Sequence, residues 1–455
     1  MQETIAAISS AVGKAGIGIV RMSGVNAFEI GKKVFRPFNK KEEIKNKYMT
    51  YGHIVDEEEN IIDEVLVAFM KGPYTYTRED IVEIYCHGGV VSVRKTLNIL
   101  LKSGARLAER GEFTKRAFLN GRIDLSQAEA VIDIINADVD KLYDASMKQL
   151  EGSLTNEVGK IKDNVFSMLT NMEYIINFME DIDEEPPLDP IIESGKKAIF
   201  GIDKLLKTKN KGKILRNGIS TAIVGKPNVG KSSLLNILLN ENRAIVTDIP
   251  GTTRDTIEES IDLDGIKLKI TDTAGIRKTD DFVESIGVEK SIDLIEKSDL
   301  IIAIFDGSEK LDEEDKEIIR LLQDRNAILI LNKIDKGLVV DEDSFSKINP
   351  NNIIKTSMIK RLGIEDLIEH ISDMFFDGDI DNTDQTLVTN ERHINLLEKS
   401  KNSLESSVKD IERGVTLEAC EIDVNNAYEF LSQITGEAVG EEVLDNIFNE
   451  FCIGK

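Results

Sequence analysis

Apolar and polar positions along the 455-residue chain change their spacing in clearly separated regions. Near the N-terminus, short runs at 17–24 and 64–69 have the residue types of β-strands. Apolar residues at 90–101 recur with the spacing of an amphipathic helix, and glycine-rich turns lie between these segments. This mixture predicts an α+β domain over residues 1–118.

A helical pattern with few breakers replaces this mixture from about residue 126. Helices are expected at 126–179, 189–209, 390–413 and 423–451. The acidic segment 180–187, which ends in two prolines, is expected to be a loop. We therefore predict one discontinuous α-helical domain, made from residues 119–212 and 377–455.

Between these helical segments, residues 213–376 alternate strands and helices. Continuous apolar runs at 300–305 and 327–331 are typical of a parallel sheet whose two faces are both covered by helices. Because surface loops tolerate domain insertion, we predict an α/β domain inserted into the helical one. The expected fold class is thus multidomain, with α+β, α-helical and α/β P-loop parts.

The α/β region carries a phosphate-binding motif, Gly-Lys-Pro-Asn-Val-Gly-Lys-Ser at 225–232, between a strand and a helix. Gly225 and Gly230 allow the backbone N–H groups to face phosphates. Lys231 offers a positive charge to the outer phosphates, and the Ser232 hydroxyl can bind Mg²⁺. An ordinary glycine-rich turn is the alternative, but the strand and helix around the motif favour a nucleoside triphosphate.

Further motifs favour GTP over ATP. Asp335, in Asn-Lys-Ile-Asp at 332–335, can accept two N–H bonds from guanine, and adenine has no such donor pair. A switch segment precedes Asp-Thr-Ala-Gly at 272–275, and its Thr253 is a second candidate Mg²⁺ ligand. The residues expected at GTP are Asn228, Val229, Gly230, Lys231, Ser232, Ser233, Thr247, Thr252, Thr253, Asp272, Thr273, Ala274, Gly275, Asn332, Lys333, Asp335 and Ser357.

Ile276 stands where many GTPases carry the glutamine that orients the attacking water. An isoleucine side chain cannot form a hydrogen bond, so another residue must position the water or hydrolysis must be slow. Together with the preceding motifs, this feature resembles the translation-factor-related GTPases, in the branch with a hydrophobic catalytic position.

Composition restricts the remaining possibilities. A net charge of −25 and a pI near 4.7 argue against a broad basic surface, although a local basic patch is compatible with them. Three cysteines argue against a disulfide framework, and no Cys/His cluster has zinc spacing. Without a signal-peptide pattern or a membrane-spanning apolar run, a cytoplasmic protein without membrane attachment is expected.

Four segments outside the nucleotide region resemble the MnmE (TrmE) family of tRNA-modification GTPases: 16–24, 83–89, 111–121 and the C-terminal Phe-Cys-Ile-Gly-Lys at 451–455. The resemblance implies a homodimer formed by the N-terminal domain and a heterotetramer with the FAD-dependent protein MnmG. It further implies modification of C5 of the wobble uridine of certain tRNAs. The added aminomethyl or carboxymethylaminomethyl group would take its one-carbon unit from a 5-formyltetrahydrofolate-type folate.

The same resemblance implies roles for individual residues. Folate contacts would be Arg21, Glu83, Arg122 and Lys455, and K⁺ ligands would be Asn228, Thr247, Ile249 and Thr252. Glu284 would orient the attacking water in place of the missing glutamine, and Cys452 would be required for tRNA modification.

Other interpretations of these residues stay open from the sequence. Arg21 and Glu83 also suit structural charges on strands, and position 122 is often Lys in this family. Asn228 also suits a simple turn, with Arg254 as an arginine finger in cis. Cys452 also suits an inert buried thiol.

Two other functions are alternatives to tRNA modification. A ribosome-assembly GTPase would be expected to carry a second nucleotide domain or a basic RNA-binding appendage, whereas the C-terminal segment here is helical and acidic. A membrane-remodelling GTPase would be expected to carry a basic amphipathic or apolar segment, which the sequence lacks.

Overall fold

A computed structural model describes residues 3–39, 41, 43–178, 187–241, 244–245, 259–270, 295–323, 325–341, 345, 352–376 and 385–455. Its contacts divide the chain into two units, and we describe each by itself. Unit 1 comprises residues 1–132, 149–187 and 413–455, and unit 2 comprises residues 133–148 and 188–412. No described helix combines the length and apolar character needed to cross a lipid bilayer.

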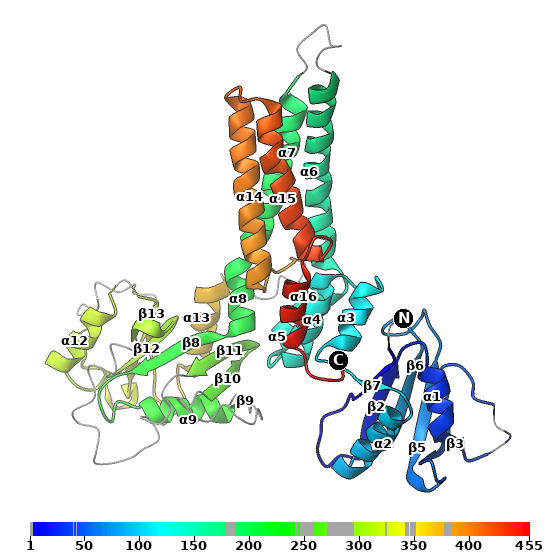
Figure 1. Cartoon of the computed structure of the whole chain (residues 1–455). Helices are drawn as coiled ribbons and strands as arrows, with labels where there is room; N and C mark the ends of the chain where they lie inside the picture. The colour runs from blue at the N-terminus through cyan, green and yellow to red at the C-terminus, as the bar shows by residue number, and fades with distance from the viewer. Residues whose placement is uncertain are drawn as a thin grey trace. The chain divides into compact units, whose positions relative to one another are not determined.

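Unit 1 contains a sheet with strand order β3-β4-β5-β6-β2-β1-β7. Its strands are β1 (Ile5–Ile8), β2 (Ile17–Ser23), β3 (Phe35–Pro37), β4 (Met49–Val55), β5 (Ile61–Met70), β6 (Ile81–His87) and β7 (Arg106–Leu107). Helices α1 (Ala27–Val34) and α2 (Val90–Lys102) pack on one face and bury the core around Phe69 and Leu100 (Figure 1). The predicted strands at 17–24 and 64–69 and the predicted helix at 90–101 are confirmed.

The helices of unit 1 other than α1 and α2 come from two distant parts of the sequence. They are α3 (Glu112–Leu119), α4 (Leu125–Asn136, whose last turn belongs to unit 2), α6 (Ser153–Phe178), α15 (Leu417–Thr435) and α16 (Glu441–Asn449). Helices α6 and α15 lie side by side (Figure 1). The first and second predicted helical segments therefore pack against each other.

The predicted continuous helix at 423–451 is wrong, because α15 ends at Thr435 and α16 begins at Glu441. Gly436 follows α15 with a φ of 89°, a left-handed conformation that stops a helix. A Cβ atom at position 436 would lie 2.8 Å from both Leu125 Cβ and the Phe118 ring. Close packing against these two side chains therefore requires glycine at the break.

Unit 2 contains a sheet with strand order β14-β13-β12-β8-β11-β10-β9. Its strands are β8 (Ile219–Val224), β9 (Ala244–Ile245), β10 (Glu259–Leu263), β11 (Ile266–Ile270), β12 (Leu300–Asp306), β13 (Ala327–Asn332) and β14 (Ile353–Lys355). The predicted parallel pairing holds from β14 to β11, whereas β10 and β9 pair antiparallel. The two-residue turn at Asp264 and Gly265 gives the chain no room for a parallel crossover between β10 and β11.

Helices of unit 2 accompany this sheet. They are α5 (Asp140–Leu150, whose last two residues belong to unit 1), α7 (Asp189–Leu206), α8 (Lys209–Asn217), α9 (Lys231–Glu241), α12 (Glu313–Leu321), α13 (Ile364–Phe376) and α14 (Glu391–Glu412). Helix α14 confirms the prediction for 390–413 and packs against α7. Helix α7 confirms the helix predicted at 189–209 except for its last three residues, and α8 then runs to Asn217 before Gly218, which has a φ of 76°. Apolar side chains on both faces of the sheet form two buried clusters.

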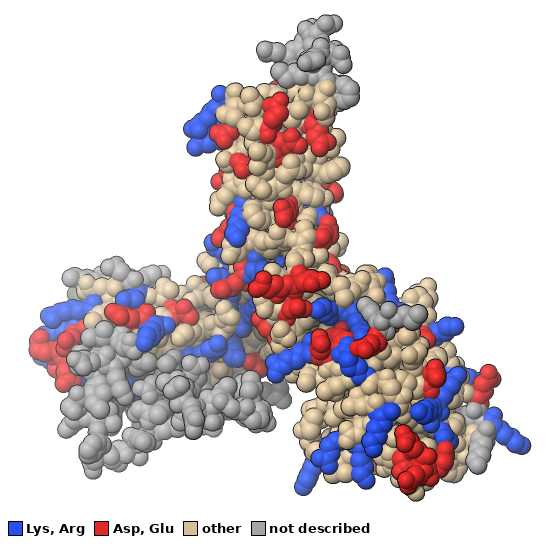
Figure 2. Space-filling view, in the orientation of Figure 1, with Lys and Arg blue, Asp and Glu red and all other residues tan. Residues whose placement is uncertain are grey.

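Both acidic and basic side chains are exposed on the face shown in Figure 2. The predicted loop at 180–187 lies outside the described residues, apart from Pro187. The domain boundaries at 118, 212 and 376 remain predictions, because division by contacts groups the helices differently.

Candidate functional site

The phosphate loop connects the end of β8 to the start of α9, as the motif predicts. Gly225 has a φ of 144°, Asn228 of 62° and Gly230 of 117°. A Cβ atom would lie 2.4 Å from Ile304 O at position 225 and 2.3 Å from Asn332 Nδ2 at position 230. Backbone conformation and lack of space thus both require glycine at these two positions.

Lys231 is held over this loop. Its ammonium donates hydrogen bonds of 2.6 Å to both Gly225 O and Lys226 O. Burial lowers the pKa of Lys231, because desolvation disfavours the charged form. Ser232 and Ser233 follow in the first turn of α9, where helix N–H groups attract anions. The described part of the loop therefore gathers a cation, hydroxyls and backbone donors at one strand end.

A second lysine, Lys226, holds the phosphate loop against the start of α12. Lys226 Nζ lies 2.6 Å from an Asp312 oxygen and 2.8 Å from an Asp315 oxygen. Both carboxylates cap the start of α12 through a reciprocal capping box. Burial would lower the pKa of Lys226, but the hydrogen bonds to Asp312 and Asp315 outweigh it and raise the pKa. These two ion pairs were not predicted from the sequence. The acidic residues at the start of α12 were the signal that could have indicated them.

Asn332 joins three of the predicted motifs. Its Nδ2 donates to Val229 O in the phosphate loop at 2.8 Å. Its Oδ1 accepts from Met358 N at 3.1 Å and from Thr356 Oγ1 at 3.3 Å. Asn332 is only 3% exposed, so these contacts are shielded from water. The base-binding motif and the phosphate loop are thus fixed to each other by one buried amide.

The other base-binding residues lie beside Asn332. Ser357 Oγ donates to Asp335 Oδ1 at 2.6 Å, and this bond lowers the pKa of Asp335. Lys333 has a φ of 65° and donates to Asp306 Oδ2 at 2.6 Å. Burial would raise the pKa of Asp306, but the bonds from Lys333 and Ser308 lower it. An ionised Asp335 is the acceptor that two guanine N–H groups require.

Part of the predicted site lies outside the described residues. These residues are Thr247, Ile249, Thr252, Thr253, Asp272, Thr273, Ala274, Gly275 and Glu284. Of the predicted Mg²⁺ ligands, only Ser232 lies among the described residues. Of the predicted K⁺ ligands, only Asn228 does. Among the described residues, no group of three or more His, Cys, Asp or Glu side chains has metal-binding geometry.

In unit 1, Arg21 and Glu83 face each other across neighbouring strands β2 and β6. Arg21 Nε lies 2.8 Å from Glu83 Oε1, and both side chains are largely buried. Tyr85 donates its hydroxyl to Glu83 Oε2 at 2.7 Å. Burial and the neighbouring Glu83 raise the pKa of Tyr85 to about 12, so this hydroxyl stays protonated. Arg21 and Glu83 are therefore an ion pair, as the structural interpretation allows, and they belong to a larger polar group.

The predicted residue Arg122 joins this group through Tyr76. The guanidinium carbon of Arg122 lies 4.6 Å from the Tyr76 ring centroid, and that of Arg21 lies 5.5 Å from it. The Tyr76 hydroxyl is 2.9 Å from Thr114 Oγ1 on α3. Two cations distant in the sequence thus meet at one aromatic ring. Sequence reasoning missed Tyr76, which lies in an irregular loop without periodicity.

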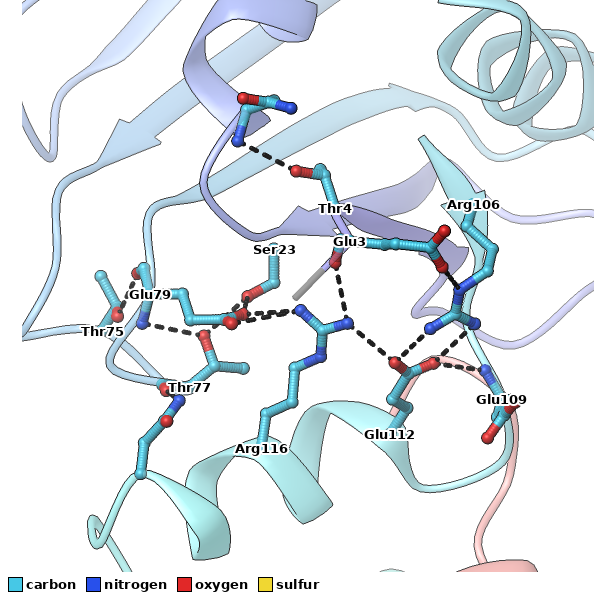
Figure 3. Close-up of polar contacts among 12 residues, drawn as sticks. Glu3, Thr4, Ser23, Thr75, Thr77, Glu79, Arg106, Glu109, Glu112 and Arg116 are labelled. Atoms are coloured by element: carbon cyan, nitrogen blue, oxygen red, sulfur yellow. Dashed lines mark hydrogen bonds and ion pairs between the residues drawn. The ribbon is translucent and has the colours of Figure 1, made fainter. Parts of the chain in front are cut away.

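Ion pairs hold this loop against α3 (Figure 3). Arg116 on α3 donates to both Glu79 carboxylate oxygens at 3.2 and 3.1 Å, and to Glu112 Oε1 at 2.8 Å. It also donates to Glu3 O at 2.9 Å. Arg106 contacts both oxygens of Glu112, and the Ser23 hydroxyl donates to Glu79 at 2.6 Å. Because Arg116 is only 4% exposed, the network fixes α3, and with it Tyr76, to the sheet.

The C-terminal residues return to the N-terminal part of unit 1. Phe113 N donates to Lys455 O at 3.2 Å, Gly111 N to Cys452 O at 3.4 Å and Ser9 Oγ to Gly454 O at 3.0 Å. A Cβ at position 454 would lie 2.1 Å from Ile8 O, so this contact requires glycine. Cys452 is exposed, and the inert buried interpretation of this thiol is therefore wrong.

Comparisons with known proteins identify the family of the chain. The family described as GTP-binding protein TrmE N-terminus matches residues 4–122, and the MnmE helical domain matches residues 125–452. The chain is 56% identical to the tRNA modification GTPase MnmE of Finegoldia magna and 49% identical to that of Alkaliphilus oremlandii, in each case over 100% of both chains. The G domain of the T. maritima FeoB iron transporter covers 34% of this chain and 97% of its own, with 23% identity. Its TM-score of 0.26 is too low to add to the assignment.

These relatives match the chain over its full length, and the two family models match residues 4–122 and 125–452. The chain belongs to the tRNA modification GTPase MnmE family.

Proposed function

We propose that this GTPase couples GTP hydrolysis to modification of C5 of the tRNA wobble uridine, together with the FAD-dependent protein MnmG. The observation that carries the nucleotide half is the Asn332 amide, which holds the base-binding motif against the phosphate loop. The tRNA-modification half is supported by the guanidinium groups of Arg21 and Arg122, which both lie over the Tyr76 ring. The family assignment connects the two halves in one chain.

In the nucleotide half, Lys231 would exchange its two loop carbonyls for the outer phosphates of GTP. Asp335 would select guanine through its N–H groups. The Ser232 hydroxyl at the start of α9 is a suitable Mg²⁺ ligand, and Thr253 would be the second. Asn228 is exposed on the loop, so its amide oxygen suits K⁺, with Thr247, Ile249 and Thr252 as further ligands. Bound K⁺ would neutralise charge between the phosphates, and Glu284 would orient the attacking water.

In the other half, the residues fit a reduced folate of the 5-formyltetrahydrofolate type. Arg21, Arg122 and Lys455 offer positive charge for the glutamyl carboxylates, and Tyr76 offers an aromatic face for the pterin ring. Glu83 can accept from pterin N–H groups. The folate would supply the one-carbon unit, and the exposed Cys452 would take part in the uridine chemistry.

A homodimer through the N-terminal sheet is part of the proposal. Helices α1 and α2 cover one face of this sheet. Phe38 directly after β3, Tyr51 of β4 and Leu66 of β5 are exposed large apolar residues. Phe38 and Tyr51 rings lie 5.3 Å apart. A face of this kind supports burial against a second copy. GTP hydrolysis would then reorganise this cytoplasmic dimer within a heterotetramer with MnmG.

Packing of α6 on α15 and of α7 on α14 supports a helical domain into which the GTPase domain is inserted. In each pair, one helix precedes the nucleotide-binding region and the other follows it. Both connections of the nucleotide-binding region lead into these helices. A conformational change caused by GTP hydrolysis could therefore be transmitted to both helical segments.

Mass spectrometry of tRNA nucleosides tests the proposal. A strain lacking the gene should lose the modified wobble uridine, and the wild-type chain should restore it. Lys231→Ala and Arg21→Ala should each fail to restore it although the proteins accumulate normally. Unchanged modified uridine in the deletion strain would refute the proposal, and a ribosome-assembly defect without that loss would favour the rival function.

A further inference from the structure

A cavity of about 440 Å³ in unit 1 belongs to neither site described above. Lys162, Asp163 and Phe166 of α6 line it, with Tyr428 and Thr435 of α15. Asp124, Thr155 and Glu437 belong to the polar part of its wall. Cavities of roughly 300–1,000 Å³ hold small organic ligands. The space is therefore large enough for a nucleoside.

Aromatic rings form one side of this cavity. Phe166 is 60% exposed, although it belongs to a helix that packs into a bundle. Its ring centroid lies 6.4 Å from that of Tyr428, at an interplanar angle of 46°. The exposed Phe166 ring gives a flat base a surface on which to stack, and Tyr428 extends this surface beside the ring face that the Lys162 ammonium approaches. The aromatic pair thus favours a planar ligand.

Among the described residues, carboxylates outnumber cations in this cavity, because Asp124, Asp163 and Glu437 line it together with the single cation Lys162. Lys162 is 9% exposed, its ammonium forms an ion pair with Glu437, and it lies 5.0 Å from the Tyr428 ring centroid. Thr435 Oγ1 donates to the other Glu437 oxygen at 3.1 Å. A paired cation does not favour an anion, but the Lys162 ammonium has three donors and Glu437 retains acceptor capacity. The wall therefore suits a neutral ligand with alternating acceptors and donors, as on the edge of uracil.

A neighbouring cavity of about 310 Å³ shares part of its wall with this space. Asp124, Thr435 and Glu437 line both cavities, and Arg122 lines the second one. Arg122 is also the cation over Tyr76. A base held beside Lys162 would thus lie next to the place where the proposed function puts the one-carbon donor.

We propose that the cavity between α6 and α15 binds the unstacked wobble uracil of tRNA, with Phe166 and Tyr428 as the stacking surface and Lys162 as a donor to a base carbonyl. This inference rests on the proposed function and deepens it, because it gives the RNA substrate a position. It concerns binding and orientation only. Enzymes that act on one base commonly take that base out of its stack into such a pocket.

Fluorescence of an anticodon stem-loop RNA tests the inference. The RNA carries 2-aminopurine next to the wobble uridine, so that unstacking of the uridine increases its emission. It is titrated with the full-length chain in the presence of the MnmG partner, folate and GTP, and the partner alone serves as the blank. The wild-type chain should raise the emission, and Phe166→Ala and Tyr428→Ala should each weaken the response roughly ten-fold.

Tyr174→Ala is the matched control, because Tyr174 is an equally exposed aromatic residue of α6 that does not line the cavity. GTP hydrolysis and thermal unfolding should be unchanged in all three variants, which separates loss of binding from loss of folding. Full fluorescence responses and normal uridine modification in Phe166→Ala and Tyr428→Ala would overturn the inference. If the wild-type chain produced no modified uridine, the proposed function would fail instead, so the two failures are distinguishable.

Discussion

Asn332 donates its side-chain amide to the carbonyl oxygen of Val229, a residue 103 positions earlier in the chain. This hydrogen bond joins the part of the site that reads the base to the part that holds the phosphates. The same amide oxygen accepts from Met358 N, so one side chain sets the spacing of three loops.

Replacing Asn332 with Ala should weaken GTP binding about ten-fold or more, because Val229 O and Met358 N then lose a buried partner. Isothermal titration with GTP measures this directly. Asn352→Ala is the control, since Asn352 donates to Ala327 O at the start of the same strand without contacting the phosphate loop. Equal GTP affinity in Asn332→Ala and the wild-type chain would show that the bond does not organise the site.

Lys226→Met should accelerate nucleotide release several-fold, because it frees the phosphate loop from α12 and leaves the buried Asp315 carboxylate without its cation. Release of a fluorescent GDP analogue in stopped-flow measurements gives the rate. Lys226→Arg should restore slow release because it preserves the charge. Fast release in the arginine variant would mean that the ion pair is not the cause.

The effect of Lys226→Met should not depend on pH between about pH 5 and about pH 9. Lys226 has a pKa raised above 10.5, so its contribution is complete below 10.5 and is lost only as the pH rises through the raised value. Asp312 has a pKa lowered below 3.8, so its contribution is complete above 3.8 and is lost only as the pH falls through the lowered value. Both partners therefore stay charged across the whole working range.

Asn228 should determine the response to potassium. Asn228→Gly removes the amide oxygen without straining the left-handed backbone, and it should reduce the acceleration of GTP hydrolysis by KCl over NaCl roughly ten-fold. Asn228→Asp keeps a side-chain oxygen and tolerates the same backbone, so it should retain most of the acceleration. Equal rates in KCl and NaCl for the wild-type chain would remove K⁺ from the mechanism.

Cys452→Ser should leave GTP hydrolysis unchanged and abolish uridine modification. The tail is held by the backbone carbonyl of Cys452, so serine should keep it in place while removing the thiol. Ile453→Ala changes the exposed neighbouring residue and should modify tRNA normally. Mass spectrometry of tRNA from cells that carry each variant decides between a chemical and a structural role, and normal modification by Cys452→Ser would exclude the thiol.

Local signals predicted much of the fold and of the nucleotide site. The loop from Gly225 to Ser232 is short and continuous, and its spacing alone indicates what it binds. Helix α14 follows from its periodicity to within one residue at each end. Features that depend on tertiary contacts could not be predicted in this way. Gly436 ends α15 where Phe118 and Leu125 pack against it, and no local pattern reveals those neighbours.

The same limit applies to the candidate sites. Tyr76 becomes important only because α3 brings Thr114 and Arg116 to its loop, and Lys226 only because α12 begins beside it. Arg21 and Arg122 were predicted from the resemblance to a family. The residues that hold them in position could be identified only in the structure.

The most direct test of the account is a reconstituted reaction that contains the purified chain, MnmG, substrate tRNA, a reduced folate, Mg²⁺ and KCl. Modified wobble uridine is quantified by mass spectrometry with GTP or with a non-hydrolysable GTP analogue. Modified uridine should form with GTP, and almost none should form with the analogue. Equal yields with both nucleotides would contradict the coupling of GTP hydrolysis to uridine modification.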